Sequence, residues 1–124
     1  MAIIGFVTPN FPTILAGQIQ EAVYSTQSAF PLPRLRVPLP RAGALRRFRS
    51  IVNSNSLDAP LVLHVLIGGV VTALTITYPA GITGGKAFDV FVPAAAGNVV
   101  SFKMDASAAG VGNAEVNGAV EFVP

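Results

Sequence analysis

Residues 61–77 read LVLHVLIGGVVTALTIT and predict a β-hairpin. Leu61–Ile67 is a continuous apolar run of strand length, and Val70–Thr77 alternates apolar residues with threonine over part of its length. Gly68-Gly69 joins the two runs, and glycine readily adopts the positive φ angles that a two-residue hairpin turn requires. The pattern therefore indicates an antiparallel pair of strands near the middle of the chain.

Further short strands are expected on both sides of this hairpin. The expected strand regions are 50–53, 88–92, 100–104 and 120–122. Turn residues separate them at intervals of about 8 to 14 residues, which is typical of antiparallel sandwiches and jelly rolls. We therefore predict an all-β fold, namely a small antiparallel jelly roll or β-sandwich.

The segment before these strands has a different composition. Residues 31–49, PLPRLRVPLPRAGALRRFR, contain six of the eight basic residues and four of the ten prolines. Each proline removes an amide donor and favours extended geometry at the preceding residue, which predicts a polyproline II or extended chain. We interpret residues 1–48 as an extended N-terminal arm, with a Pro/Arg strap at 31–49, and residues 49–124 as the β module.

The first part of the arm leaves two alternatives open. Residues 1–12 predict a short strand or an extended peptide, because Pro9 and Pro12 prevent a continuous helix. In residues 13–27, apolar side chains recur at helical spacing, whereas Gly17 disfavours a helix by about 1 kcal/mol relative to alanine. Both a short helix and an extended strand remain open for 13–27.

Composition favours an oligomer. Charged residues are 11% of the chain, against about 25% in an ordinary soluble domain, and hydrophobic residues are 52%. A module of about 76 residues is marginally stable alone, and the absence of cysteine excludes disulfides and thiolate metal sites. We therefore expect an obligate oligomer; the alternative is a small, poorly soluble monomer.

The strand at 61–67 is apolar on both faces, which requires a cover on each side. A neighbouring subunit would provide it, and so would a loop or the N-terminal arm folded over the strand. The residues that we predict at a subunit interface are Leu61, Leu63, His64, Val65 and Ile67.

The sequence contains no recognisable catalytic constellation. His64 is the only histidine, and we interpret it as a buried or interface residue with one hydrogen-bonded nitrogen. The carboxylates are scattered, and residues 105–110 lack the further acidic ligands of a calcium loop. Gly110-Val111-Gly112 lacks the third glycine of a dinucleotide-binding turn. We expect no enzymatic activity, no cofactor and no metal site.

The arginines provide the positive signal for binding. The residues predicted to contact a partner are Arg34, Leu35, Arg36, Val37, Arg41, Arg46, Arg47 and Arg49. We favour a strap between proteins, in which guanidinium groups bind carboxylates and Leu or Val side chains fill grooves. Nucleic acid is a minority alternative, because the tract offers only Phe48 for base stacking. A membrane-active peptide and a solvated linker are the other readings.

The start of the chain shows no secretory signal, since Met1-Ala2-Ile3-Ile4 lacks a basic region. No run of about 20 apolar residues occurs without a breaker. We therefore expect no membrane partner and synthesis in a cytosol.

The order of strands and turns after residue 60 matches that of a known fold type. It runs through 61–67, 70–77, the turn Pro79-Ala80-Gly81, Phe88–Val92, Val99–Lys103 and Glu121-Phe122. This part of the chain, residues 50–124, resembles the trimeric jelly rolls of the C1q and tumour-necrosis-factor type. It is similar in style to the decoration, or cement, proteins of tailed-bacteriophage capsids. The match is one of pattern and not of a specific motif.

The resemblance implies a homotrimer that binds the major capsid protein and clamps neighbouring capsid subunits. It also implies a place on the virion surface after synthesis in the host cytoplasm, and no active site. The Gly-X-Y stalk of C1q-like relatives is absent here, and the Pro/Arg arm stands in its place. The alternative is a C1q-like or adhesin head that binds a surface through loops 53–59, 79–86 and 105–118. A third is a protein that binds nucleic acid through its arm.

Overall fold

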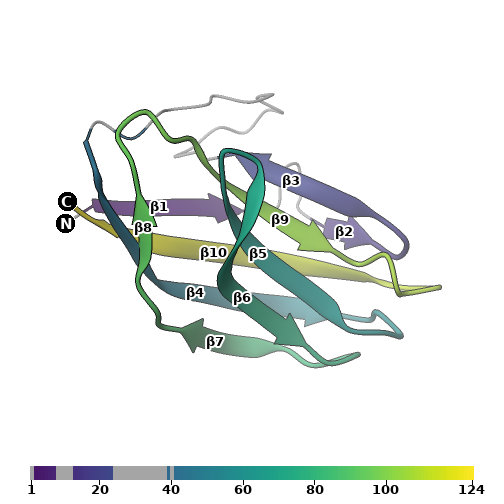
Figure 1. Cartoon of the computed structure of the whole chain (residues 1–124). Coiled ribbons are helices and arrows are strands. Elements are labelled where there is room, and N and C mark those ends of the chain that lie inside the picture. Colours follow the sequence, from purple (N-terminus) through teal and green to yellow (C-terminus); the bar gives the residue numbers. More distant parts are fainter. Residues whose placement is uncertain (1, 8–12, 24–38, 40) are drawn as a thin grey trace.

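The computed structural model describes residues 2–7, 13–23, 39 and 41–124, and the structural statements below concern these residues. They form two antiparallel β-sheets packed as a sandwich (Figure 1), which confirms the predicted all-β class. No helix occurs in the described ranges, so none of their segments is a helix able to cross a membrane.

The larger sheet, sheet A, contains six strands in the order β1–β10–β4–β7, with β2 added beside β10 and β8 beside β4. Its strands are β1 (Ala2–Val7), β2 (Thr13–Leu15), β4 (Gly43–Asn55), β7 (Gly84–Phe88), β8 (Val92–Ala94) and β10 (Asn113–Val123). The long strands β4 and β10 form its centre.

The smaller sheet, sheet B, contains four strands in the order β3–β9–β5–β6. They are β3 (Ile19–Val23), β5 (Leu61–Ile67), β6 (Val70–Tyr78) and β9 (Val100–Asp105). Ile67 pairs with Val70 across a two-residue turn, in which Gly68 and Gly69 have φ angles of 59° and 83°. The predicted Gly-Gly hairpin is therefore confirmed.

Alternate residues of both sheets fill the core between them. The largest fully buried side chains include Phe48 from sheet A and Phe102 from sheet B, whose ring centroids lie 6.1 Å apart. Leu61, Leu63 and Val65 are also fully buried in this core. Their assignment to a subunit interface therefore needs correction, because their side chains already pack inside one chain.

The described part of residues 1–48 contributes strands to both sheets. β1 and β2 pair with β10, and β3 pairs with β9. The division drawn between residues 48 and 49 falls inside β4, which begins at Gly43. The strap residues Arg34, Leu35, Arg36 and Val37 lie outside the described residues.

The helix considered for 13–27 is wrong over the described part of that range. Thr13–Leu15 and Ile19–Val23 are strands, and the turn between them contains Gly17 at a φ of 82°. Pairing with β10 and β9 decides the conformation here, because sheet hydrogen bonds to distant strands outweigh a weak local helical preference.

One buried hydroxyl links the two sheets near their edge. Tyr78, at the end of β6, lies 2.9 Å from the Ser50 hydroxyl of β4 and 2.8 Å from the Gly84 carbonyl oxygen of β7. The Lys86 ammonium lies 5.2 Å from the centre of the Tyr78 ring and donates a hydrogen bond to the Thr77 carbonyl. These contacts close the sandwich edge between β6 and β7.

Candidate functional site on the outer face of sheet A

A bulge in β4 positions two consecutive arginines. Ala119 pairs with Arg49 and Glu121 pairs with Arg46, so two residues of β4 lie opposite one residue of β10. Arg47, in this bulge, has a φ of 49°, and no other non-glycine residue in the described ranges has a positive φ. Bulges of this kind usually place glycine at the left-handed position, because a side chain there costs about 1–2 kcal/mol.

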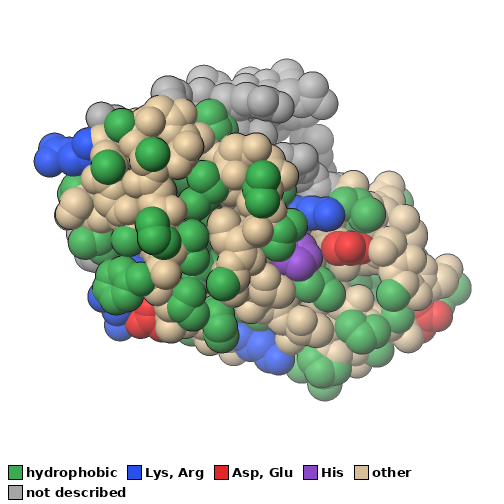
Figure 2. Space-filling view, in the orientation of Figure 1, with side chains coloured by type: hydrophobic (Ala, Val, Ile, Leu, Met, Phe, Trp, Pro, Cys, Tyr) green, Lys and Arg blue, Asp and Glu red, His purple; other side chains and the backbone are tan. Residues whose placement is uncertain are grey.

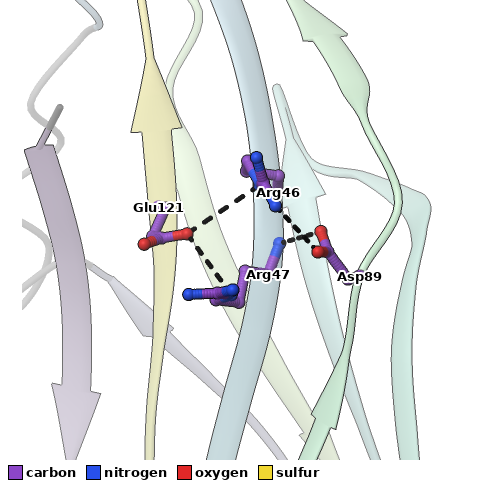
Figure 3. A network of polar contacts seen from close by, with 4 residues as sticks. All are labelled: Arg46, Arg47, Asp89 and Glu121. Carbon is purple, nitrogen blue, oxygen red and sulfur yellow. Dashed lines mark hydrogen bonds and ion pairs between the residues drawn. The ribbon is translucent and has the colours of Figure 1, made fainter.

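Two carboxylates hold the bulge (Figure 3). The Arg46 guanidinium donates a 2.8 Å hydrogen bond to Asp89, and the backbone N–H of Arg47 donates to the other oxygen of the same carboxylate at 3.2 Å. The hydrogen bond from Arg46, together with the nearby positive charges, lowers the pKa of Asp89. Asp89 therefore fastens the segment after β7 to the bulge.

The second carboxylate, Glu121, is nearly buried and lies between the two arginines. Its Oε2 atom is 3.9 Å from the Nε atom of Arg46 and 3.8 Å from that of Arg47. Both distances are too long for hydrogen bonds, and the buried Nε atom of Arg46 has no hydrogen-bond partner. The network is thus tight at Asp89 and loose at Glu121.

An exposed phenylalanine lies against this network. The Arg46 guanidinium is 4.9 Å from the centre of the Phe91 ring, a cation–π contact. Phe91 is 62% exposed, and Phe88 is 42% exposed. We call Arg46, Arg47, Asp89 and Phe91 the Phe91 cluster.

A shallow groove of about 290 Å³ lies next to the arginines, where β4 and β10 run side by side. The residues that line it are Arg49, Ser50, Ile51, Asn117, Gly118 and Ala119. The neighbouring strands present small residues in the same register, since Gly5 pairs with Ala119 and Ala87 pairs with Arg49. The groove therefore has a low, mostly apolar surface with one cation at its edge.

Some of the residues predicted from the sequence to bind a partner lie on this surface. Arg46, Arg47 and Arg49 lie together on β4, and Arg41 is exposed just before that strand. Sequence reasoning missed Asp89, Phe91 and Glu121, which come from distant segments. The strand predicted at 88–92 is wrong over residues 89–91, which connect β7 to β8, and its alternation gave no sign that Asp89 and Phe91 would contact the arginines.

His64 lies on the outer face of sheet B, opposite Lys103 in register, and is half-buried. Its Nδ1 atom is 3.2 Å from the Thr75 hydroxyl oxygen. Burial lowers the pKa of His64, the charge of Lys103 lowers it further, and Asp105 partly opposes both effects. Within the described ranges, no three His, Cys, Asp or Glu side chains lie close enough to hold a metal ion.

Comparisons with known proteins add a likeness of fold. No protein-family model matches the chain, and no curated protein matches it. Among solved structures, a family 35 carbohydrate-binding module from Clostridium thermocellum is similar, with a TM-score of 0.42 and 11% sequence identity. The similarity covers 93% of this chain and 96% of that module.

Proposed function

We propose that this chain is a non-catalytic structural module that acts by binding other protein subunits. The observation that carries the proposal is the Phe91 cluster, an exposed aromatic ring stacked on an arginine that Asp89 holds in place. Aromatic residues and arginine are enriched in protein interfaces and supply most of their energetic hot spots. A cluster that is already rigid loses little side-chain entropy when a partner binds.

The rest of the surface supports the same proposal. Hydrophobic side chains occupy much of the face seen in Figure 2, and charged side chains are few. Large apolar residues that are exposed include Leu15, Ile19, Ile51, Val70, Val71, Ile82, Phe88, Phe91 and Val111. These residues come from several strands and loops, and contacts with other subunits would cover them.

The specific role that we propose is that of a trimeric capsid decoration protein, which clamps neighbouring subunits of the shell from the virion surface. Its support is the strand pattern and the low charge of the sequence, together with the exposed Phe91 cluster. His64 and Ile67 are only partly buried and remain available as trimer contacts in this proposal.

The test compares Phe91→Ala with Val111→Ala, a matched change at another exposed apolar residue, which is 64% exposed. Light scattering measures the oligomeric state, and co-sedimentation measures binding to shells assembled from the capsid protein of the same genome. We expect Phe91→Ala to weaken shell binding by about 30-fold, the effect of a 2 kcal/mol hot spot, and Val111→Ala to change it less than threefold. If the wild-type chain stays monomeric at micromolar concentration and does not bind shells, the proposal is refuted.

The second candidate is a carbohydrate-binding module. Phe91 provides an exposed aromatic ring next to charged groups, which a sugar-binding surface needs. A glycan-array signal that Phe91→Ala abolishes, in the absence of shell binding, would select this candidate over the first.

A further inference from the structure

Positive charge is left unmatched on the outer face of sheet A. Arg49 is exposed, and in the described part of the chain its side chain makes no hydrogen bond or ion pair. The Arg47 side chain is 50% exposed, and its one ion pair is the loose contact of 3.8 Å with Glu121. Neither guanidinium group is therefore used fully by the fold.

The carboxylates whose side chains are described are engaged inside the chain. Asp58 accepts hydrogen bonds from backbone N–H groups, Asp105 from Ser107, and Glu115 from Asn53. Asp89 and Glu121 belong to the bulge network. Among the carboxylates of the described residues, only Glu121 comes near Arg47 and none pairs with Arg49, so charge complementarity calls for an acidic partner.

The conformation of Arg47 points in the same direction. Its left-handed backbone is one that glycine adopts without strain, yet an arginine occupies the position. Strained residues of this kind concentrate at binding and catalytic sites, where the surrounding structure holds them. Here Asp89 holds the backbone, and the Arg47 side chain keeps only its loose contact with Glu121.

The adjoining groove defines the rest of the ligand. Its volume of about 290 Å³ equals the space of roughly ten water molecules, enough for a few side chains. Ile51, Gly118 and Ala119 make most of its wall apolar, and Arg49 lies at its edge. A ligand that fits must combine apolar side chains with negative charge.

We propose that this surface, formed by the groove together with Arg47 and Arg49, binds an extended segment of a partner protein in which acidic and apolar residues alternate. Carboxylates of the segment pair with the two guanidinium groups, and an apolar side chain lies against Ile51 and Ala119. Guanidinium groups suit this task because they bind carboxylates in a bidentate manner. The inference rests on the proposed function as a subunit-binding module and names the chemistry of the partner.

The experiment uses the full chain and four fluorescent probes: the peptides (Asp-Val)₄, (Asp-Ser)₄ and (Lys-Val)₄, and a single-stranded DNA of similar charge. Fluorescence anisotropy measures each affinity at low and physiological salt. We expect (Asp-Val)₄ to bind at least about fivefold more tightly than (Asp-Ser)₄, and (Lys-Val)₄ not to bind. Tighter binding of the DNA than of (Asp-Val)₄ would overturn the proposal in favour of nucleic acid.

Two variants then locate the site. Arg49→Gln removes the cation at the groove edge, and Arg47→Gly removes the second cation at a backbone conformation that glycine prefers. Each should weaken (Asp-Val)₄ binding by at least about fivefold, the usual effect of losing a charged contact in an interface. Arg47→Gly should melt within about 3 °C of wild type, because the relief of strain offsets the added freedom of the unfolded chain.

The control is Lys103→Gln, which removes one positive charge from sheet B and should leave peptide affinity unchanged within twofold. Equal losses in Lys103→Gln and Arg49→Gln would show a general charge effect and refute the site. If no peptide binds while Phe91→Ala still abolishes shell binding, this inference fails and the proposed function stands. If (Asp-Val)₄ binds at the groove but the chain does not bind shells, the proposed function is refuted and this inference stands.

Discussion

Tyr78→Phe removes one oxygen atom from the buried contact that links the two sheets. The ring remains, so the apolar area buried by the residue is almost unchanged. What is lost is the hydroxyl, which accepts from Ser50 at 2.9 Å and donates to the Gly84 carbonyl oxygen at 2.8 Å. Ser50 is 3% exposed, so water cannot easily replace its partner, whereas exposed Gly84 can be hydrated.

These exposures set the expected cost. Leaving the buried Ser50 hydroxyl without its partner costs about 1 kcal/mol, and the Gly84 hydrogen bond adds about 0.5 kcal/mol, so the free energy of unfolding should fall by about 1–2 kcal/mol. For a chain of this length that is a fall of roughly 4–8 °C in melting temperature. Urea titration followed by far-UV circular dichroism is the assay, since the chain has no tryptophan.

A double-mutant cycle with Ser50→Ala isolates the pair. The coupling energy between the two changes should be about 0.5–1.5 kcal/mol, because each single variant already removes the shared hydrogen bond. If Tyr78→Phe unfolds within 0.3 kcal/mol of wild type (about the usual resolution of such comparisons), the linking role of this hydroxyl is refuted. A coupling energy of zero would refute it equally.

The contact between Tyr78 and Ser50 should also affect how folding stability depends on pH in alkaline solution. Burial raises the pKa of Tyr78, and its hydrogen bonds to Ser50 and to the backbone only partly oppose this. The unfolded chain therefore loses the phenolic proton at a lower pH than the folded chain, and folding stability falls as pH rises above the ordinary tyrosine value of about 10. The stability advantage of the wild type over Tyr78→Phe should shrink in that range.

Three further predictions concern other parts of the sandwich. Because burial lowers the pKa of His64, the wild type should lose stability as pH falls through its ordinary value of 6.5, and the melting temperature of His64→Gln should fall less between pH 7 and pH 5. Gly112→Ala should lower the free energy of unfolding by about 3 kcal/mol or more in urea titrations, because φ there is 101° and the added Cβ would overlap the Ser56 carbonyl. The control is Gly97→Ala, at a φ of 86° with open space around it, which should lower the free energy of unfolding by only about 1 kcal/mol. Backbone hydrogen bonds lower the pKa of Asp58, so its contribution is present above its ordinary value of 3.8 and lost below it; Asp58→Ala should therefore unfold at lower urea than wild type at pH 5, with a smaller difference at pH 3.

The middle of the fold could be predicted from the sequence because its signals are local. The hairpin at 61–77 has its turn, its strand lengths and its alternation within one short stretch. By contrast, Gly84–Phe88 is an edge strand that reads as a turn, because Gly84 and Gly85 carry no side chain to show alternation. The N-terminal part of β10 reads as a loop for the same reason, since alanine, glycine and asparagine make up most of residues 113–119.

Only part of the candidate site could be predicted from the sequence, for a different reason. The arginines of β4 stand out by composition, but their partners Asp89 and Glu121 are far away in the sequence. Nor does any local pattern predict a left-handed conformation at Arg47, since it follows from the register between β4 and β10. Contacts between distant segments, rather than residue types, determine which arginines remain free.

The position of β10 in the sheet has a consequence for folding during synthesis on the ribosome. This strand is the last of the ten in sequence, yet it lies between β4 on one side and β1 and β2 on the other. As translation proceeds, the first strands must wait unpaired until residues 113–123 have emerged, and pairing over such sequence distances is slow. The apolar β1 segment is therefore accessible to chaperones during synthesis, and loss of β10 would leave it without its place in the sheet.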